Sequence, residues 1–273
     1  MEMVWLVFKI IIDTYYPNTI NYLSIYRIIL YKCSVMSTEY FILSREKGGD
    51  VTNISTDSTC CLDKRLNFIL PKNLYSCYAD NGLFESSLIE WCKQFCNDGK
   101  VVLDIGAHTG SYAISLAAHA MHVHAFEPQR MTYYSLCGGV SLSGIRNVTC
   151  HNIGLGSQSQ VGKQRLHIVS NDGGGSSIQE QKEGSILAHE DIDVVTLDSL
   201  AIDNISFVKI DVEDNELSVL QGATETLERS NYPPIMFECN DVTKHTDLWS
   251  FIQSLSYNII TIGGVKNMYL ATK

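Results

Sequence analysis

The chain has 273 residues, 45% of them hydrophobic, which is enough for one large α/β domain with an extension or for two small domains. Its formal net charge is −10 at pH 7, and between Glu180 and Glu216 eleven Asp or Glu residues face only two Lys, a balance of −9. Such an acidic segment argues against a nucleic-acid partner, because the phosphate backbone is bound by basic surfaces.

Cysteine usage and the N-terminal residues point to a cytoplasmic protein without a membrane span. The nine cysteines are odd in number and irregularly spaced, and no Cys-x-x-Cys pair occurs, so we expect reduced thiols. The apolar stretches of the first 35 residues are interrupted by charges well before the roughly 20 apolar residues that a membrane span needs. No small-residue cleavage site follows a basic start, so no secretory leader is expected.

The sequence divides into an N-terminal extension and one larger domain. Residues 1–60 end in a polar stretch and are interpreted as an N-terminal extension of unknown structure, followed by one domain over residues 61–273. In that domain, the alternation of polar and apolar residues over Arg65–Leu70 predicts a half-buried strand. The apolar spacing over Leu83–Phe95 predicts an amphipathic helix.

Strands and helices then alternate at short intervals. Val101–Gly110 (VVLDIGAHTG) predicts a buried strand that ends in a glycine-rich turn, with a helix starting at Ser111. Met121–Glu127 and Val148–Ile153 predict two further strands, and Met131–Ser143 predicts the helix between them. This β–α–β–α–β order is the signature of a doubly wound parallel sheet.

Beyond Gly154 the pattern becomes irregular before the alternation resumes. Arg165–Val169 predicts an edge strand, and residues 171–177 predict a flexible polar loop whose glycines could let it close over a substrate. The remaining predicted elements are a short strand leading into a turn at Asp193–Leu200, a strand at Ile205–Asp211, a helix at Glu216–Ser230, a strand at Ile235–Glu238, a helix at Thr246–Leu255, and a hairpin built from Tyr257–Ile262 and Asn267–Leu270.

Four of the predicted strands end in an acidic residue: Asp104, Glu127, Asp211 and Glu238. In an open parallel sheet, ligands bind in the crevice outside these carboxyl ends. Glu127 follows Asp104 by 23 residues, at the position where an acidic side chain can accept hydrogen bonds from ribose hydroxyls. The turn carries only Gly106 and Gly110, so the glycine that lets a pyrophosphate approach is missing and a nicotinamide dinucleotide is disfavoured.

Four short motifs follow one another in a characteristic order. They are DIGAHTG at Asp104–Gly110, Phe126-Glu127, VTLDSL at Val195–Leu200 and VKIDVE at Val208–Glu213, extended by Glu216 and Leu220-Gln221-Gly222. Together they resemble the FkbM-type S-adenosylmethionine-dependent methyltransferases. The resemblance implies an α/β class I methyltransferase fold: a Rossmann-like, doubly wound seven-stranded sheet with an antiparallel C-terminal hairpin. It also implies O-methylation of a hydroxyl on a sugar, a glycan or another small molecule.

The resemblance assigns cofactor roles residue by residue. The glycine-rich turn would enclose the methionine part of S-adenosylmethionine, Glu127 would bind its ribose, and the region after the third strand would lie near its adenine. The candidate cofactor-binding residues are Asp104, Gly106, Ala107, His108, Thr109, Gly110, Glu127, Asn152, Ile153 and Asp211.

Three acidic residues are the candidates for the reaction itself. The resemblance implies that Asp211 and Glu213 face the methyl group and the acceptor, and Glu238 joins them by its position at a strand end. A sugar hydroxyl is weakly acidic, so these carboxylates could orient it, or hold a divalent cation that acidifies it. The chain departs from the family pattern twice, with His108 where Asn is usual and Asp214 where Gly is usual.

Two other functions remain open at this point. An RNA ribose methyltransferase needs a catalytic lysine, and Lys209 lies two residues before Asp211, on the same side of a strand. The acidic segment around Lys209 disfavours that reading. The other alternative is a non-catalytic methyltransferase fold that serves as a binding or assembly module through residues 1–60.

Overall fold

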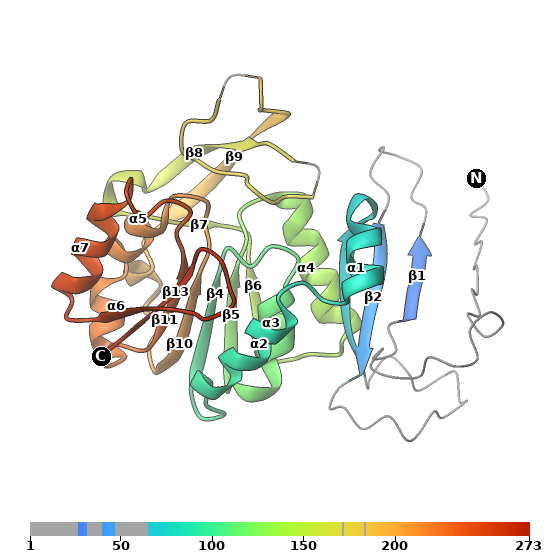
Figure 1. Ribbon diagram of the computed structural model, residues 1–273, viewed down its shortest axis with the longest axis horizontal. Coiled ribbons are helices and arrows are strands. Elements are labelled where there is room, and N and C mark those ends of the chain that lie inside the picture. Colours follow the sequence, from blue (N-terminus) through green and yellow to red (C-terminus); the bar gives the residue numbers. More distant parts are fainter. Residues whose placement is uncertain (1–26, 32–39, 47–64, 171, 183) are drawn as a thin grey trace.

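The computed structural model describes residues 27–31, 40–46, 65–170, 172–182 and 184–273 (Figure 1). Its main body is a seven-stranded sheet. In spatial order its strands are β12 (Asn258–Thr261), β13 (Met268–Thr272), β11 (Ile235–Glu238), β10 (Ile205–Ile210), β4 (Val101–Ile105), β5 (His122–Phe126) and β6 (Val148–His151). Strands β11, β10, β4, β5 and β6 pair in parallel, whereas β13 is antiparallel to both of its neighbours. The predicted doubly wound sheet with an antiparallel C-terminal hairpin is therefore confirmed.

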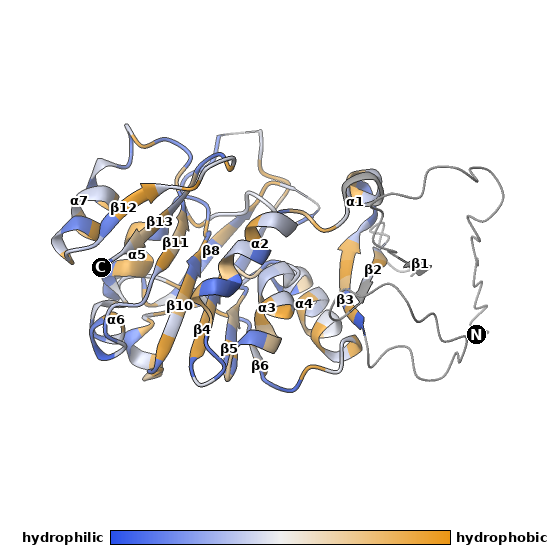
Figure 2. Cartoon of the chain, turned by 60° about the horizontal axis from the view of Figure 1, so that its bottom comes forward, coloured by the Kyte–Doolittle hydropathy of each residue, from blue (hydrophilic) through white to orange (hydrophobic). Residues whose placement is uncertain are grey.

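Each face of this sheet packs against its own layer of helices, and the apolar strands lie between the two layers (Figure 2). Successive side chains of a strand point to opposite faces. In β4, Val102 accordingly belongs to one apolar cluster, and Leu103 and Ile105 belong to the other. Helices α1 (Tyr75–Asn81), α2 (Ser86–Cys92), α3 (Ser111–Leu116) and α4 (Arg130–Leu142) contribute to the first cluster, and α5 (Glu216–Gln221), α6 (Thr224–Arg229) and α7 (Thr246–Ser254) to the second.

A second sheet packs against α4, beside the first helical layer (Figure 1). It contains β1 (Arg27–Tyr31), β2 (Tyr40–Glu46) and β3 (Arg65–Pro71), all antiparallel, and β3 confirms the strand predicted there. Phe41 and Leu43 of β2 are fully buried in the core, so part of the segment interpreted as an extension packs with the main domain. Most of residues 1–60 lie outside the described residues.

The third sheet confirms one sequence prediction and corrects another. It consists of β7 (Gly154–Leu155), β9 (Ala188–Val195) and β8 (Gly162–Ile168), and it lies across one end of the main sheet (Figure 1). Strand β8 lies at the edge of this sheet, antiparallel to β9, so the predicted edge strand is confirmed. Strand β9 begins at Ala188, five residues before the predicted start at Asp193. The prediction missed its first half because that half is polar, and only Ile192 and Val194 are buried.

The single helix predicted over Glu216–Ser230 is in fact two short helices, α5 and α6, which are separated at Gly222-Ala223. Gly222 packs so tightly that a Cβ atom there would lie 2.1 Å from the carbonyl oxygen of Gly156. The carboxylate of Asp198 then accepts hydrogen bonds at the start of α6, at 2.7 Å from the Thr226 N–H. This close approach and new cap end one helix and begin the next.

Helix α1 was not predicted, whereas α2, α3, α4 and α7 occur where helices were expected. Helix α2 begins at Ser86 rather than Leu83, because Glu85 before it has a left-handed backbone (φ 55°). Helices α4 and α7 match their predicted spans to within one residue at each end. Across the described ranges, no helix is both long and apolar enough to cross a membrane.

Candidate functional site

A cavity of about 530 Å³ opens at the carboxyl ends of the parallel strands. Its wall includes the residues that follow or end four neighbouring strands: Gly106 after β4, Glu127 after β5, Asp211 after β10 and Glu238 in β11. This is the edge at which open α/β sheets bind their ligands, and the volume is that of a small-molecule site. The structure thus places these four side chains or backbones around one cavity.

The glycine-rich turn is held against the neighbouring strands by close backbone contacts. The N–H groups of Gly106 and Ala107 both donate to the carbonyl oxygen of Phe126, at 3.0 and 2.9 Å. Gly106 has φ +75°, and a Cβ atom there would lie 1.8 Å from the carbonyl oxygen of Asp211. Because only glycine fits this left-handed, crowded position, the turn can follow the sheet closely and leave Ala107 and His108 on the cavity wall.

The described part of the predicted polar loop lies over the cavity and makes hydrogen bonds on both sides of it. The imidazole of His108, kept neutral because burial lowers its pKa, donates through Nε2 to the carbonyl oxygen of Asp172 at 2.6 Å. On the other side, Glu213 accepts hydrogen bonds from the Gly175 N–H at 2.9 Å and, through its carbonyl, from the Ser177 hydroxyl at 2.6 Å. Residues 172–177 therefore form one wall of the site.

Glu127 holds the turns after two strands. It is 7% exposed; its carboxylate accepts the His108 N–H at 2.9 Å and the Gln129 N–H at 2.8 Å. Burial raises the pKa of Glu127 to about 7, while the two N–H donors act in the opposite direction. Each oxygen receives one backbone donor, so each keeps a further lone pair for a ligand.

Four predicted cofactor-binding residues are not part of the cavity wall. Asp104 is buried and accepts the Ala113 N–H of helix α3 at 2.8 Å, and Thr109 and Gly110 lie in the turn behind the wall. The side-chain amide of Asn152 donates to the carbonyl oxygens of Glu127 and Pro128, at 3.0 and 2.9 Å. These residues shape the turns, whereas Gly106, Ala107, His108, Glu127, Ile153 and Asp211 line the cavity.

Lys209 is a site residue that we considered only for the RNA alternative. It is the penultimate residue of the apolar strand β10 and is almost fully buried. Its ammonium donates to the carbonyl oxygen of Gly106 at 2.8 Å, and it lies 3.4 Å from Asp211 and 3.7 Å from Asp104. Burial alone would lower the pKa of Lys209, but the two carboxylates outweigh it and raise that pKa.

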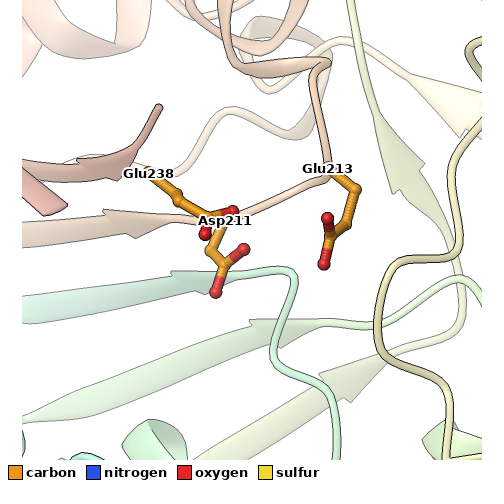
Figure 3. A group of neighbouring side chains, drawn as sticks. All are labelled: Asp211, Glu213 and Glu238. Carbon is orange, nitrogen blue, oxygen red and sulfur yellow. The ribbon is translucent and has the colours of Figure 1, made fainter. Parts of the chain in front are cut away.

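Asp211, Glu213 and Glu238 form an acidic cluster, and one oxygen of each lies within 4.8 Å of the others (Figure 3). Burial and the neighbouring Asp211 and Glu213 carboxylates raise the pKa of Glu238 to about 8, and burial also raises that of Glu213. Three carboxyl groups this close cannot all ionise freely without a cation or a proton between them. Oxygen ligands of this kind suit Mg²⁺ or Ca²⁺.

The departure at Asp214 keeps the backbone shape that a glycine would allow. Glu213 and Asp214 both have left-handed φ values, 54° and 73°, in the turn that follows β10. Asp is among the residues that tolerate this conformation best after glycine. The Asp214 carboxylate lies 3.3 Å from Nε2 of His245, outside the acidic cluster.

The remaining walls could not be located from the sequence. The third sheet supplies an apolar wall through Leu155, Leu166 and Ile192. On the opposite side, the hydroxyl of Tyr112 donates to the carboxylate of Glu85 at 2.8 Å, and both side chains line the cavity. No motif marks these residues, because they reach the cavity through sheet pairing and helix packing.

Three solved structures illustrate what the chain resembles. A precorrin-6y C5,15-methyltransferase from Geobacter metallireducens GS-15 is 14% identical, with a TM-score of 0.44 over 71% of this chain and 91% of that chain. An rRNA methylase from Streptococcus thermophilus is also 14% identical (TM-score 0.43; 68% and 92% covered). A Streptococcus mutans protein described as a methyltransferase, in complex with SAH, is 12% identical (TM-score 0.43; 68% and 93% covered).

The comparison with protein families identifies the domain. No curated protein matches the chain in sequence. The family of the methyltransferase FkbM domain matches residues 104–259, which is more than half of the chain and contains the glycine-rich turn, Glu127 and the acidic cluster. The chain therefore belongs to the FkbM methyltransferase family.

Proposed function

We propose that this protein is an S-adenosylmethionine-dependent O-methyltransferase that acts on a hydroxyl of a sugar, a glycan or another small molecule. The observation that carries the proposal is that the acidic cluster and the glycine-rich turn face the same cavity. Methyl transfer needs a reactive donor and an acceptor held in line with it. One cavity meets both needs, because the glycine-rich turn and Glu127 would bind the donor and the acidic cluster would bind the acceptor.

The residues present fit S-adenosylmethionine. When bound, this cofactor would supply an electrophilic methyl group on its sulfonium. Gly106, Ala107 and His108 would enclose its methionine part, because the turn brings the backbone to the cavity wall without side-chain bulk. Glu127 would accept hydrogen bonds from the ribose hydroxyls through its remaining lone pairs, and Ile153 would lie beside the adenine.

The acidic cluster would bind and orient the acceptor. Asp211 has one oxygen near Lys209, and its carboxyl group adjoins those of Glu213 and Glu238. A carboxyl whose pKa is raised to about 8, such as that of Glu238, is a stronger base than an ordinary one. If the three oxygens instead hold a divalent cation, Glu238 would be a ligand rather than a base, and the cation would lower the pKa of the hydroxyl.

The contacts of Lys209 do not favour the RNA alternative. Lys209 and Asp211 do lie on the same side, but the ammonium of Lys209 is held by the Gly106 carbonyl and by two carboxylates. These carboxylates raise the pKa of Lys209, so it stays protonated and cannot accept the proton of a ribose hydroxyl. Lys209 is better suited to fix the glycine-rich turn.

The proposed function is tested by the transfer of labelled methyl from S-adenosylmethionine to a panel of glycans and small hydroxylated molecules. We expect transfer to at least one acceptor, loss of transfer in a chelator, and recovery after Mg²⁺ is added back. Calorimetric titration of the folded protein with S-adenosylmethionine should give saturable heat, and its absence would overturn the proposal. Full activity in the chelator would refute the role of the cation but would not contradict the methyltransferase activity.

Substitutions in the two walls should affect different constants. Glu127→Gln should weaken S-adenosylmethionine binding by roughly 10- to 100-fold, because hydrogen bonds to a charged acceptor contribute about 1.5–3 kcal/mol. Asp211→Asn should instead lower kcat by about 100-fold or more and change that affinity less than threefold. Calorimetry and steady-state kinetics measure both. Glu225→Gln is the matched control, because Glu225 lies exposed on α6. An unchanged affinity in Glu127→Gln would refute this placement of the ribose.

A further inference from the structure

Histidines line one face of the two strands at the edge of the main sheet. His122 and His124 are two residues apart on β5 and so point to the same face, and Thr149 and His151 do the same on β6. Nε2 of His122 lies 2.8 Å from the hydroxyl of Thr149, and Nδ1 of His124 lies 2.9 Å from Nε2 of His151. All three imidazoles are partly exposed. Two rings from neighbouring strands thus meet nitrogen to nitrogen.

The crossover from β6 to β10 leaves this arrangement in place. Within its described residues, which omit 171 and 183, the crossover forms β7, β8, β9 and 3₁₀ turns but no α-helix. In a doubly wound sheet a helix usually covers such a face. Here the imidazole of His151 stacks on the ring of Phe126, with centroids 4.5 Å apart and planes at 12°. The ring of Phe126 therefore supports His151 from below, and the histidines remain partly exposed to solvent.

The two facing nitrogens are spaced for one metal ion. A Zn–N bond is about 2.0–2.1 Å, so two nitrogens on a tetrahedral ion lie about 3.3 Å apart. His124 and His151 have to separate by only a few tenths of an ångström and turn toward the ion. One nitrogen now donates its hydrogen to the other, and on binding that ring would carry its N–H on its other nitrogen, so no proton is lost.

The nitrogen ligands at this face select a different class of metal from the acidic cluster. Neutral imidazole is the form that binds metals, and it suits Zn²⁺, Cu²⁺ and Ni²⁺. The acidic cluster at Asp211 offers only oxygen ligands, which suit Mg²⁺ or Ca²⁺ instead.

We propose that His124 and His151 bind a transition-metal ion of the zinc class on this face, with His122 as the third ligand once its hydrogen bond to Thr149 opens. The site is separate from the proposed methyl-transfer cavity and does not depend on that function. The Glu127 N–H donates to the carbonyl oxygen of His151 at 3.0 Å. An ion here would therefore join β5 to β6 directly beside the turn that carries Glu127.

The test is a calorimetric titration of the full chain with ZnCl₂ in the presence of excess MgCl₂, added to compete with Zn²⁺ for the oxygen ligands of the acidic cluster. We expect one Zn²⁺ per chain and an affinity that falls at least about 100-fold in His124→Gln and in His151→Gln, more than the loss of an outer partner causes. His122→Gln should weaken binding by about tenfold or more. X-ray absorption at the zinc edge should show imidazole nitrogen ligands. Circular dichroism checks that each variant is folded.

Two control variants separate this site from others. His189 lies opposite His167 in a second cross-strand histidine pair, so His189→Gln should keep its Zn²⁺ affinity within about threefold. Asp211→Asn should keep it too. The proposal is wrong if the folded chain takes up no Zn²⁺, if His124→Gln binds as the unchanged chain does, or if either control variant loses the ion. An unchanged Zn²⁺ affinity in His122→Gln would refute the assignment of His122 as the third ligand.

Discussion

Replacing Gly106 by alanine is expected to abolish cofactor binding and to destabilise the fold by about 2–5 kcal/mol. The added Cβ would lie 1.8 Å from the carbonyl oxygen of Asp211, a backbone atom that cannot move independently of β10. A left-handed φ costs a non-glycine residue about 1–2 kcal/mol, and overpacking adds about 1–3 kcal/mol. To make room, the turn must move away from Asp211 and from the Phe126 carbonyl that now holds it.

Urea unfolding and calorimetry with S-adenosylmethionine measure the two effects of Gly106→Ala. The matched control is Gly263→Ala: a Cβ there meets nothing within 4 Å. This control should change the free energy of unfolding by less than about 0.5 kcal/mol and leave binding intact. If Gly106→Ala were as stable as the control and bound the cofactor equally well, the turn would not be the close-approach element described above.

Lys209→Met is expected to cost about 3–5 kcal/mol of stability at pH 7. The substitution removes the cation from between Asp104, Asp211 and the Gly106 carbonyl, and it leaves Asp104 buried with its charge uncompensated. Breaking a buried ion pair by removing one partner costs this much, because the remaining charge has lost its solvation. Turnover should also fall, since the turn and Asp211 lose their common anchor.

Two further variants show whether buried charge is the cause. Lys163→Met removes an exposed ion pair with Asp193 at 2.8 Å and should cost less than about 1 kcal/mol. Adding Asp104→Asn to Lys209→Met should restore part of the lost stability, because an amide replaces the unpaired carboxylate. Chemical denaturation of the unchanged protein, the two single variants and the double variant gives the free energies of unfolding to compare. Equal costs for Lys209→Met and Lys163→Met would contradict the assignment.

Local patterns predicted the main sheet well. The strands at Val101, Met121 and Ile205 were identified from apolar runs, and the turn from Gly106, because burial on both faces and a left-handed backbone leave direct traces in residue type. Glu216–Ser230 was predicted as one helix because local residue pattern alone does not mark a break in it. Its break depends on the contact between Gly222 and Gly156, two residues 66 positions apart, which no local pattern records.

The candidate site was predicted only in part. Acidic residues at strand ends indicated Glu127, Asp211 and Glu238, and parallel pairing brought them to one cavity as expected. Asp104 and Asn152 have the same kind of sequence position but serve the turns from behind the wall. The direction of a side chain at a turn depends on its hydrogen-bond partners, and those come from other strands.

The sequence by itself determined the family motifs, the succession of strands and helices along the α/β core and the acidic character of the strand ends, because these depend on residue type and spacing along the chain. Tertiary structure alone decided what lies beside what. Parallel pairing of β10 with β4 sets Lys209 beside Asp104, and pairing of β5 with β6 brings His124 to His151. Such contacts join residues far apart in the chain, where the free energy of burying a charge or sharing a proton depends on the neighbouring strand.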